Sequence, residues 1–176
     1  MSYIYFMMKK IHLNIFLIVI LSGCISYTRI GGVVGLSEEY LMEIPDSSKN
    51  VIVDKENITA DSLFKEVRYI LYLMDHEVAV EDPVGKYILT RPKVLGLDTE
   101  QRMKLIVVDN LGSSRLTISA DWRGETDIHS VDQAMTGIPI EKDWDEARWG
   151  LNMSGVAFAE CVAVGKQIQE GKVSFK

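Results

Sequence analysis

The chain has 176 residues, of which 47% are hydrophobic and 25% are charged, and its formal net charge is −6 at pH 7. This composition is typical of an ordinary globular protein, and the length allows a sizeable core. The negative charge opposes nucleic-acid binding, which depends on lysine and arginine neutralising phosphates. It also provides no polybasic patch for anionic lipid head groups.

The chain opens with the pattern of an export signal. Two lysines precede an apolar run at residues 15–21, and two small residues then stand directly before Cys24. Positive start, apolar middle and small-residue end are the three parts of a secretory signal. The apolar stretch is shorter than the roughly 20 residues that a membrane-spanning helix needs, so we predict a cleaved signal and not a span.

The last four residues of this segment, Leu21-Ser22-Gly23-Cys24, resemble the lipobox of bacterial lipoproteins. The resemblance implies that the signal, residues 1–23, is removed and that the sulfur of Cys24 carries a diacylglycerol. Lipoproteins of this class carry three acyl chains including palmitate, and two or more chains anchor a protein stably to a membrane. No aspartate follows Cys24, which resembles lipoproteins sent to the periplasmic side of the Gram-negative outer membrane.

The anchor also changes the charge and leaves one free thiol. The removed segment contains two lysines and no acidic residue, so cleavage takes the net charge from −6 to −8 over the remaining 153 residues. With Cys24 lipidated, Cys161 has no intramolecular partner. Membrane contact is therefore expected through the N-terminal lipid alone.

Residues 24–49 are predicted to form a lipidated leader before a single domain at 50–176. Several glycines and the cluster around Pro45 indicate little regular structure, so the leader would act as a spacer. A short helix near residues 37–42 is also predicted.

The domain begins with a β-rich run at 51–53 and a helix. Thr59 or Asp61 can accept a hydrogen bond from the free amides of a helix start. From there to Met74, apolar residues recur at intervals of three and four and mark one buried face.

The clearest β pattern follows. Residues 78–81 and 87–91 flank the turn signal Asp82-Pro83-Val84-Gly85 and predict a hairpin. Strands at 103–108 and 116–122 are predicted next, joined by a turn at 109–112. The last of them alternates apolar and polar residues, which indicates one buried and one wet face.

The remaining chain is predicted to be a long polar loop and a helix. Residues 123–142 form either a contact surface or a flexible connection. Residues 143–169 carry an apolar stripe at helical spacing and predict a long helix, with a break near Gly150 or Gly155 because glycine weakens a helix interior.

These elements predict an α+β fold with an antiparallel sheet of about five strands and two helices on one face, in the order β-α-β-β-β-β-α. That order, over residues 51–169, is similar to one repeat of the TATA-binding-protein-like architecture and to the helix-grip domains of the outer-membrane assembly lipoprotein BamC. The resemblance concerns the order of elements and does not transfer a function.

The sequence shows no catalytic constellation, metal-ligand spacing or cofactor motif, and we predict no cofactor and no enzyme. His76 and His129 are expected in turns or on the surface. Cys161 lies on an apolar helix edge and is expected to be a small buried side chain. The acidic residues at 143, 145 and 146 are explained by a helix start.

One strand gives a hint of binding. Residues 105–108 are apolar on both faces, while the neighbouring strand places Thr117 and Ser119 outward, so Ile106 and Val108 are expected on an open face beside Ile88. Exposed apolar area commonly marks a partner site; the alternative is that the leader covers this face. We therefore predict a binding or accessory module in a cell-envelope complex, with an envelope enzyme or small-ligand carrier as the alternative.

Overall fold

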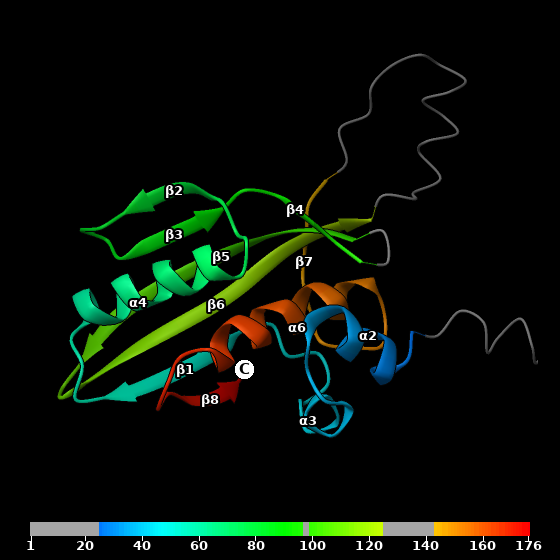
Figure 1. Cartoon of the computed structure of the whole chain (residues 1–176), viewed down its shortest axis with the longest axis horizontal. Helices are drawn as coiled ribbons and strands as arrows, with labels where there is room; N and C mark the ends of the chain where they lie inside the picture. The colour runs from blue at the N-terminus through cyan, green and yellow to red at the C-terminus, as the bar shows by residue number, and fades with distance from the viewer. Residues whose placement is uncertain (1–24, 97–98, 125–142) are drawn as a thin grey trace, which may run out of the picture.

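The computed structural model describes residues 25–96, 99–124 and 143–176, which form one antiparallel sheet with helices on one face (Figure 1). This confirms the predicted α+β class. In chain order the elements are α2 (Tyr27–Val34), α3 (Glu38–Met42), β1 (Val51–Glu56), α4 (Ala60–Leu73), β2 (Val78–Asp82), β3 (Tyr87–Thr90), β4 (Lys93–Leu95), β5 (Thr99–Asn110), β6 (Ser113–Gly124), β7 (Asp145–Glu146), α6 (Met153–Lys166) and β8 (Lys172–Phe175).

The sheet has eight strands and not about five. Six of them lie in the order β2-β3-β5-β6-β1-β8, while β4 pairs with β5 and β7 pairs with β6. The unpredicted strands β4, β7 and β8 have three, two and four residues. Segments this short carry no alternation that distinguishes a strand from a loop.

The hairpin of β5 and β6 forms the centre of the sheet. Each strand has 12 residues, and they pair without a shift from Thr99 opposite Gly124 to Asn110 opposite Ser113. The predicted turn is confirmed between them, where Gly112 has φ 78°. Glycine adopts this left-handed conformation without a steric penalty.

Helix α4 follows the predicted pattern. The Thr59 hydroxyl accepts a hydrogen bond from the Ser62 amide at 3.3 Å and so caps the first turn. The predicted apolar face is buried against β5 and β6.

Helix α6 is shorter than the predicted helix over residues 143–169. It begins at Met153, where the side chain of Asn152 accepts from the Gly155 amide at 2.9 Å. Residues before it fold back so closely that a Cβ on Gly155 would lie 1.7 Å from the Gly150 carbonyl oxygen. The acidic residues Asp145 and Glu146 consequently belong to strand β7 and not to a helix start.

The leader is part of the folded body, contrary to the expected spacer. The predicted helix near residues 37–42 is confirmed as α3, capped by Ser37, and α2 was not predicted. The glycines of this stretch had indicated little regular structure. Gly31 instead lets the backbone at Leu36 pack closely against α2, because a Cβ on Gly31 would lie 2.4 Å from the Leu36 carbonyl oxygen. Helix α2 packs on α6, so α6 lies between the sheet and α2, and every residue from 154 to 165 is buried.

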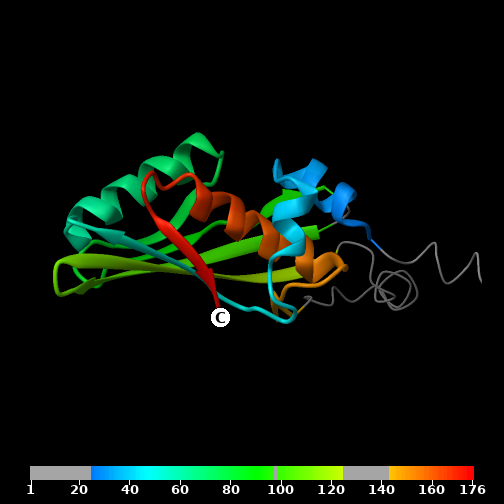
Figure 2. The ribbon, with the colours of Figure 1, turned by 90° about the horizontal axis from the view of Figure 1, so that it is seen from below.

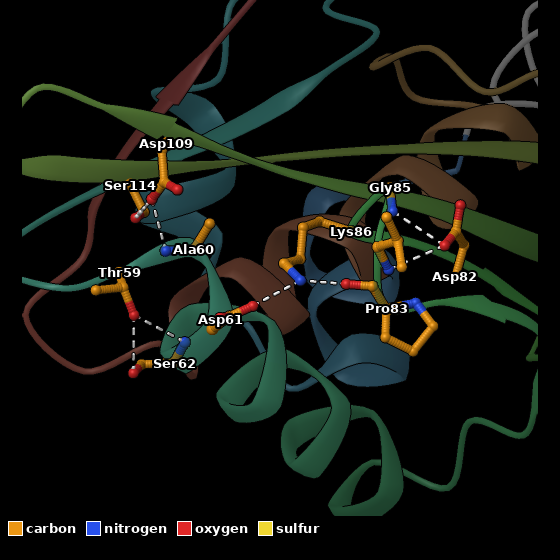
Figure 3. A network of polar contacts seen from close by, with 11 residues as sticks. Thr59, Ala60, Asp61, Ser62, Asp82, Pro83, Gly85, Lys86, Asp109 and Ser114 are labelled. Atoms are coloured by element: carbon orange, nitrogen blue, oxygen red, sulfur yellow. Dashed lines mark hydrogen bonds and ion pairs between the residues drawn. The ribbon is translucent and has the colours of Figure 1, made fainter.

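A polar network joins the start of α4 to both neighbouring hairpin turns (Figure 3). Asp109, near the β5–β6 turn, accepts from the Ala60 amide at 2.7 Å. Lys86, after the β2–β3 turn, lies 2.6 Å from a carboxylate oxygen of Asp61, and this hydrogen bond lowers the pKa of that carboxyl. The turn itself is closed by Asp82, which accepts from the Gly85 amide at 3.0 Å.

Candidate functional site: the open face of the sheet

The sheet has one covered and one open face. Within residues 25–96, 99–124 and 143–176, all helices lie on the same side of it (Figure 2). Strand β5 alternates between the two environments: Leu105 is 1% exposed, whereas its neighbours on the open side, Ile106 and Val108, are 44% and 46% exposed. The alternation follows from the two-residue period of a strand.

Apolar side chains gather at the centre of the open face. Ile106 stands opposite Tyr87 on one side and Thr117 on the other, and Thr117 stands opposite Ile52. Leu89 and Val80 form the adjacent pair on β3 and β2. We call this group the apolar band; its members are Ile52, Val80, Tyr87, Leu89, Ile106 and Val108.

Paired charges border the apolar band toward the β5–β6 turn. Arg115 holds both carboxylate oxygens of Asp54, at 2.7 and 3.1 Å. This bidentate pair raises the pKa of the guanidinium. The two charges neutralise each other locally, so this border carries little net charge.

The opposite border is an aromatic and ionic cluster. Two guanidinium groups lie over the Trp144 ring, with centroid distances of 4.6 Å for Arg102 and 4.4 Å for Arg123. Asp121 pairs with Arg102 at 3.0 Å and with Lys104 at 2.9 Å. Lys104 stands opposite Leu89 of the apolar band, and its ammonium is held by Asp121.

Four of the five predicted surface residues lie on the open face, and one does not. Ile106 and Val108 are exposed, and Thr117 and Ser119 are half-buried on the same side. Ile88 is 1% exposed because it stands opposite Leu105 and faces the helices. The prediction for Ile88 was wrong by one residue in register, which reverses the face of a side chain; Tyr87 occupies the expected place.

The alternative that the leader covers this face is also wrong for its described part. Residues 25–50 contain α2 and α3, and α2 packs on α6, on the other side of the sheet. The strand with two apolar faces therefore has one face in the core and one on the surface.

His76 is buried, contrary to its predicted place in a turn or on the surface. Its side chain is 1% exposed, and Nε2 lies 3.0 Å from a carboxylate oxygen of Glu160 in α6. The same oxygen lies 3.5 Å from the ammonium of Lys93, which also donates to the Met74 carbonyl at 2.7 Å. The backbone turns inward after α4 because Asp75 adopts φ 59°.

This buried cluster has a carboxylate next to an imidazole, and His76 also lines one of the surface hollows described below. Because a carboxylate only accepts, Nε2 is assigned as the donor of this hydrogen bond. Nδ1 and the side-chain amide of Gln101 have no hydrogen-bond partner among the described residues. We interpret the cluster as a set of structural contacts that holds α4, β4 and α6 together. Glu160 is the single charge in an otherwise apolar stretch of helix, which was the available sequence signal.

Cys161 is buried as predicted. Its thiol lies 3.5 Å from the Ala157 carbonyl oxygen, and burial raises its pKa, so the reactive thiolate is disfavoured.

Two surface hollows contain titratable groups or apolar side chains. One of about 560 Å³ lies beside His76, but its cations are already paired, Arg68 with Glu81 at 3.4 Å and Arg91 with Glu77 at 3.6 Å. Another of about 450 Å³ lies between Tyr69 and Leu73 of α4 and Gln167 after α6. Neither brings a nucleophile and a base together.

Some predictions fall outside the described residues. These are the signal with its lipobox and Cys24, His129, and the polar loop from residue 125 onward. In the part of the chain that is described, three or more potential metal-ligating side chains do not gather at one place. No helix there has the length and apolar character needed to cross a bilayer.

Comparison with known proteins adds no family. No protein-family model matches the chain, and no curated protein matches it. The resemblance of the element order to the helix-grip and TATA-binding-protein-like domains stays a prediction.

Proposed function

We propose that this protein is a lipoprotein anchored through Cys24 to the periplasmic side of the outer membrane, and that its domain is a binding or accessory module of an envelope complex. The open face is the contact surface. The observation that carries the proposal is the apolar band, in which Val80, Ile106 and Val108 are 48%, 44% and 46% exposed although the other face of β5 and β6 is packed under the helices.

The chemistry of the surface defines its partner. A patch with an apolar centre and charges paired at its border fits a folded protein surface with an apolar centre of its own, because specific interfaces combine such a core with a polar rim. Aligned packing of a second sheet or a helix on the band would bury Ile106 and Val108 at the centre.

The proposed lipid anchor is tested by replacing Cys24, whose sulfur would carry the lipid. The full chain with its signal is expressed in a Gram-negative host with labelled palmitate, beside Cys24→Ala. We expect the wild type to take up label and to sediment with the outer membrane, and the variant to lose both. Unchanged labelling and sedimentation of the variant would refute the anchor.

The contact surface is tested separately by photo-crosslinking in cells. A crosslinking amino acid replaces Thr117 on the open face or, as a control, Ser62 on the exposed side of α4. We expect one discrete adduct from position 117 that is absent from position 62. The double variant Ile106→Asp/Val108→Asp should abolish it while the protein still shows a cooperative thermal unfolding transition.

The outcomes separate the possibilities. Equal adducts from both positions, or none from position 117, would refute the open face as a contact surface. An adduct at twice the mass of the monomer would replace the envelope partner with a second copy of this chain.

A further inference from the structure

The folded body begins at the first described residue. Ile25 is buried in the hydrophobic core. Ser26 is the N-cap of α2, and its hydroxyl accepts from the Arg29 amide at 3.2 Å. Regular structure therefore starts three residues after Cys24, at Tyr27.

The first turn of α2 is held firmly by the core. The Tyr27 ring lies 6.1 Å from that of Trp149, which lies 6.3 Å from the ring of Phe158 in α6. Ile30, one turn later, is completely buried. Moving the start of α2 would require breaking this aromatic chain and exposing Ile30.

We propose that the α2 end of the domain is pressed against the lipid head groups of the membrane, in a fixed orientation. This rests on the proposed lipidation of Cys24. That residue is joined to Ile25 by one peptide bond, which separates consecutive α-carbons by about 3.8 Å. The acyl chains enter the bilayer from this point, so no flexible linker separates the bilayer from α2.

The chemistry of this end suits a phospholipid surface. Helix α2 contains no acidic residue, and its one charged side chain, Arg29, is exposed. Beside it, Val33 contacts Gly96, which follows β4. One exposed cation can pair with a single lipid phosphate, while the acyl chains of Cys24 supply the attachment to the bilayer. Glu38 of α3, which accepts from Thr28 at 2.9 Å, is the nearest acidic group by contact.

The opposite end of the molecule then points away from the membrane. In both ribbon views α2 lies at one end of the long axis and the β5–β6 turn at the other (Figures 1 and 2). Strands β5 and β6 run along this axis, and 12 residues of strand span roughly 40 Å. The sheet would stand upright on the bilayer, with the open face turned sideways toward a neighbouring envelope protein.

The orientation is tested with the lipidated full chain in vesicles of phosphatidylethanolamine and phosphatidylglycerol that carry a head-group quencher. A thiol-reactive fluorophore is placed at Thr28→Cys or, at the other end, at Leu111→Cys, whose native side chain is fully exposed. The native thiols do not compete, because Cys161 is buried and the sulfur of Cys24 is acylated. We expect several-fold stronger quenching at position 28 than at position 111.

A spacer variant provides the matched control. Twenty glycine and serine residues between Cys24 and Ile25 would span about 25 Å on average and should remove the difference between the two positions. Equal quenching without the spacer, in protein that sediments with the vesicles, would overturn the fixed orientation alone. Protein that fails to sediment would overturn the anchor itself and this inference with it.

Discussion

The two faces of the β5–β6 hairpin are built from alternate residues of the same strands but serve different purposes. On the covered face, Leu105, Leu116 and Ile118 are almost completely buried under α4 and α6. On the open face, Ile106 and Val108 are as apolar but remain exposed. Stability should therefore depend on the covered face. The open face is available for binding at little cost to the fold.

The largest contrast is expected between adjacent residues of β5. Leu105→Ala should lower the free energy of unfolding by about 2–5 kcal/mol, because it removes buried methyl groups and leaves a cavity. Ile106→Ala should lower it by less than about 1 kcal/mol, because its side chain is 44% exposed. Urea unfolding of both variants measures the contrast; similar losses would mean that the open face is buried in the protein.

A smaller effect is expected from the buried cluster on the covered side. Glu160→Gln removes the charge that faces Lys93 and His76 and should destabilise the fold by about 1–3 kcal/mol, since a charged hydrogen bond is lost. Lys93 is 28% exposed, so water partly compensates it. A double-mutant cycle with Lys93→Met isolates the pair. A coupling energy near zero would contradict our interpretation of the cluster as a set of structural contacts that holds α4, β4 and α6 together.

Two helical glycines extend the comparison to packed and open helix surfaces. A Cβ on Gly32 of α2 would meet no atom within 4 Å, so Gly32→Ala should stabilise by about 0.5–1 kcal/mol through the helix preference of alanine. A Cβ on Gly165 of α6 would lie 3.1 Å from Val51 and 3.2 Å from Val53, so Gly165→Ala should lack this gain. The melting temperatures of both variants measure these effects. An unchanged melting temperature for Gly32→Ala would argue against a helix at that position.

The smallest effect is a surface ion pair between the leader and β7. Lys49 lies 2.7 Å from Glu146 and lowers the pKa of that carboxyl below its ordinary 4.5. A lowered folded-state pKa gives stability that is present above the ordinary value and is lost as pH falls through the folded value. Lys49→Met should cost at most about 1 kcal/mol at pH 7, because both side chains are exposed. The difference in melting temperature between the two proteins should shrink from pH 6 to pH 3. A constant difference would assign the effect to packing.

Much of the fold was predictable because its main elements carry strong local patterns. The apolar period and the Thr59 cap indicated α4, and turn residues around Pro83 and Gly112 indicated both hairpins. The leader was missed since glycine usually interrupts helices, whereas in α2 it permits contact between backbones. Whether residues 25–50 pack on α6 depends on contacts that are distant in sequence.

The candidate site was predictable to within one residue of register. Strand alternation indicated which residues of β5 and β6 face outward, since those strands are long. The short strand β3 left its facing residue undetermined, and Ile88 was assigned to the wrong side. The pairing of His76 with Glu160 joins residues 84 positions apart; a single charge in an apolar stretch indicates that Glu160 needs a partner, but nothing local identifies His76 as that partner.

The short connection between residue 24 and α2 has a consequence for proteolysis of the protein. Proteases cut extended, accessible chain, and the segment that follows residue 24 is helical and packed from its first turn. Whatever is attached to residue 24 cannot be clipped from the body unless α2 first unwinds and leaves α6 uncovered. Under the proposed anchoring at Cys24, proteolytic release of an intact, folded domain is therefore disfavoured.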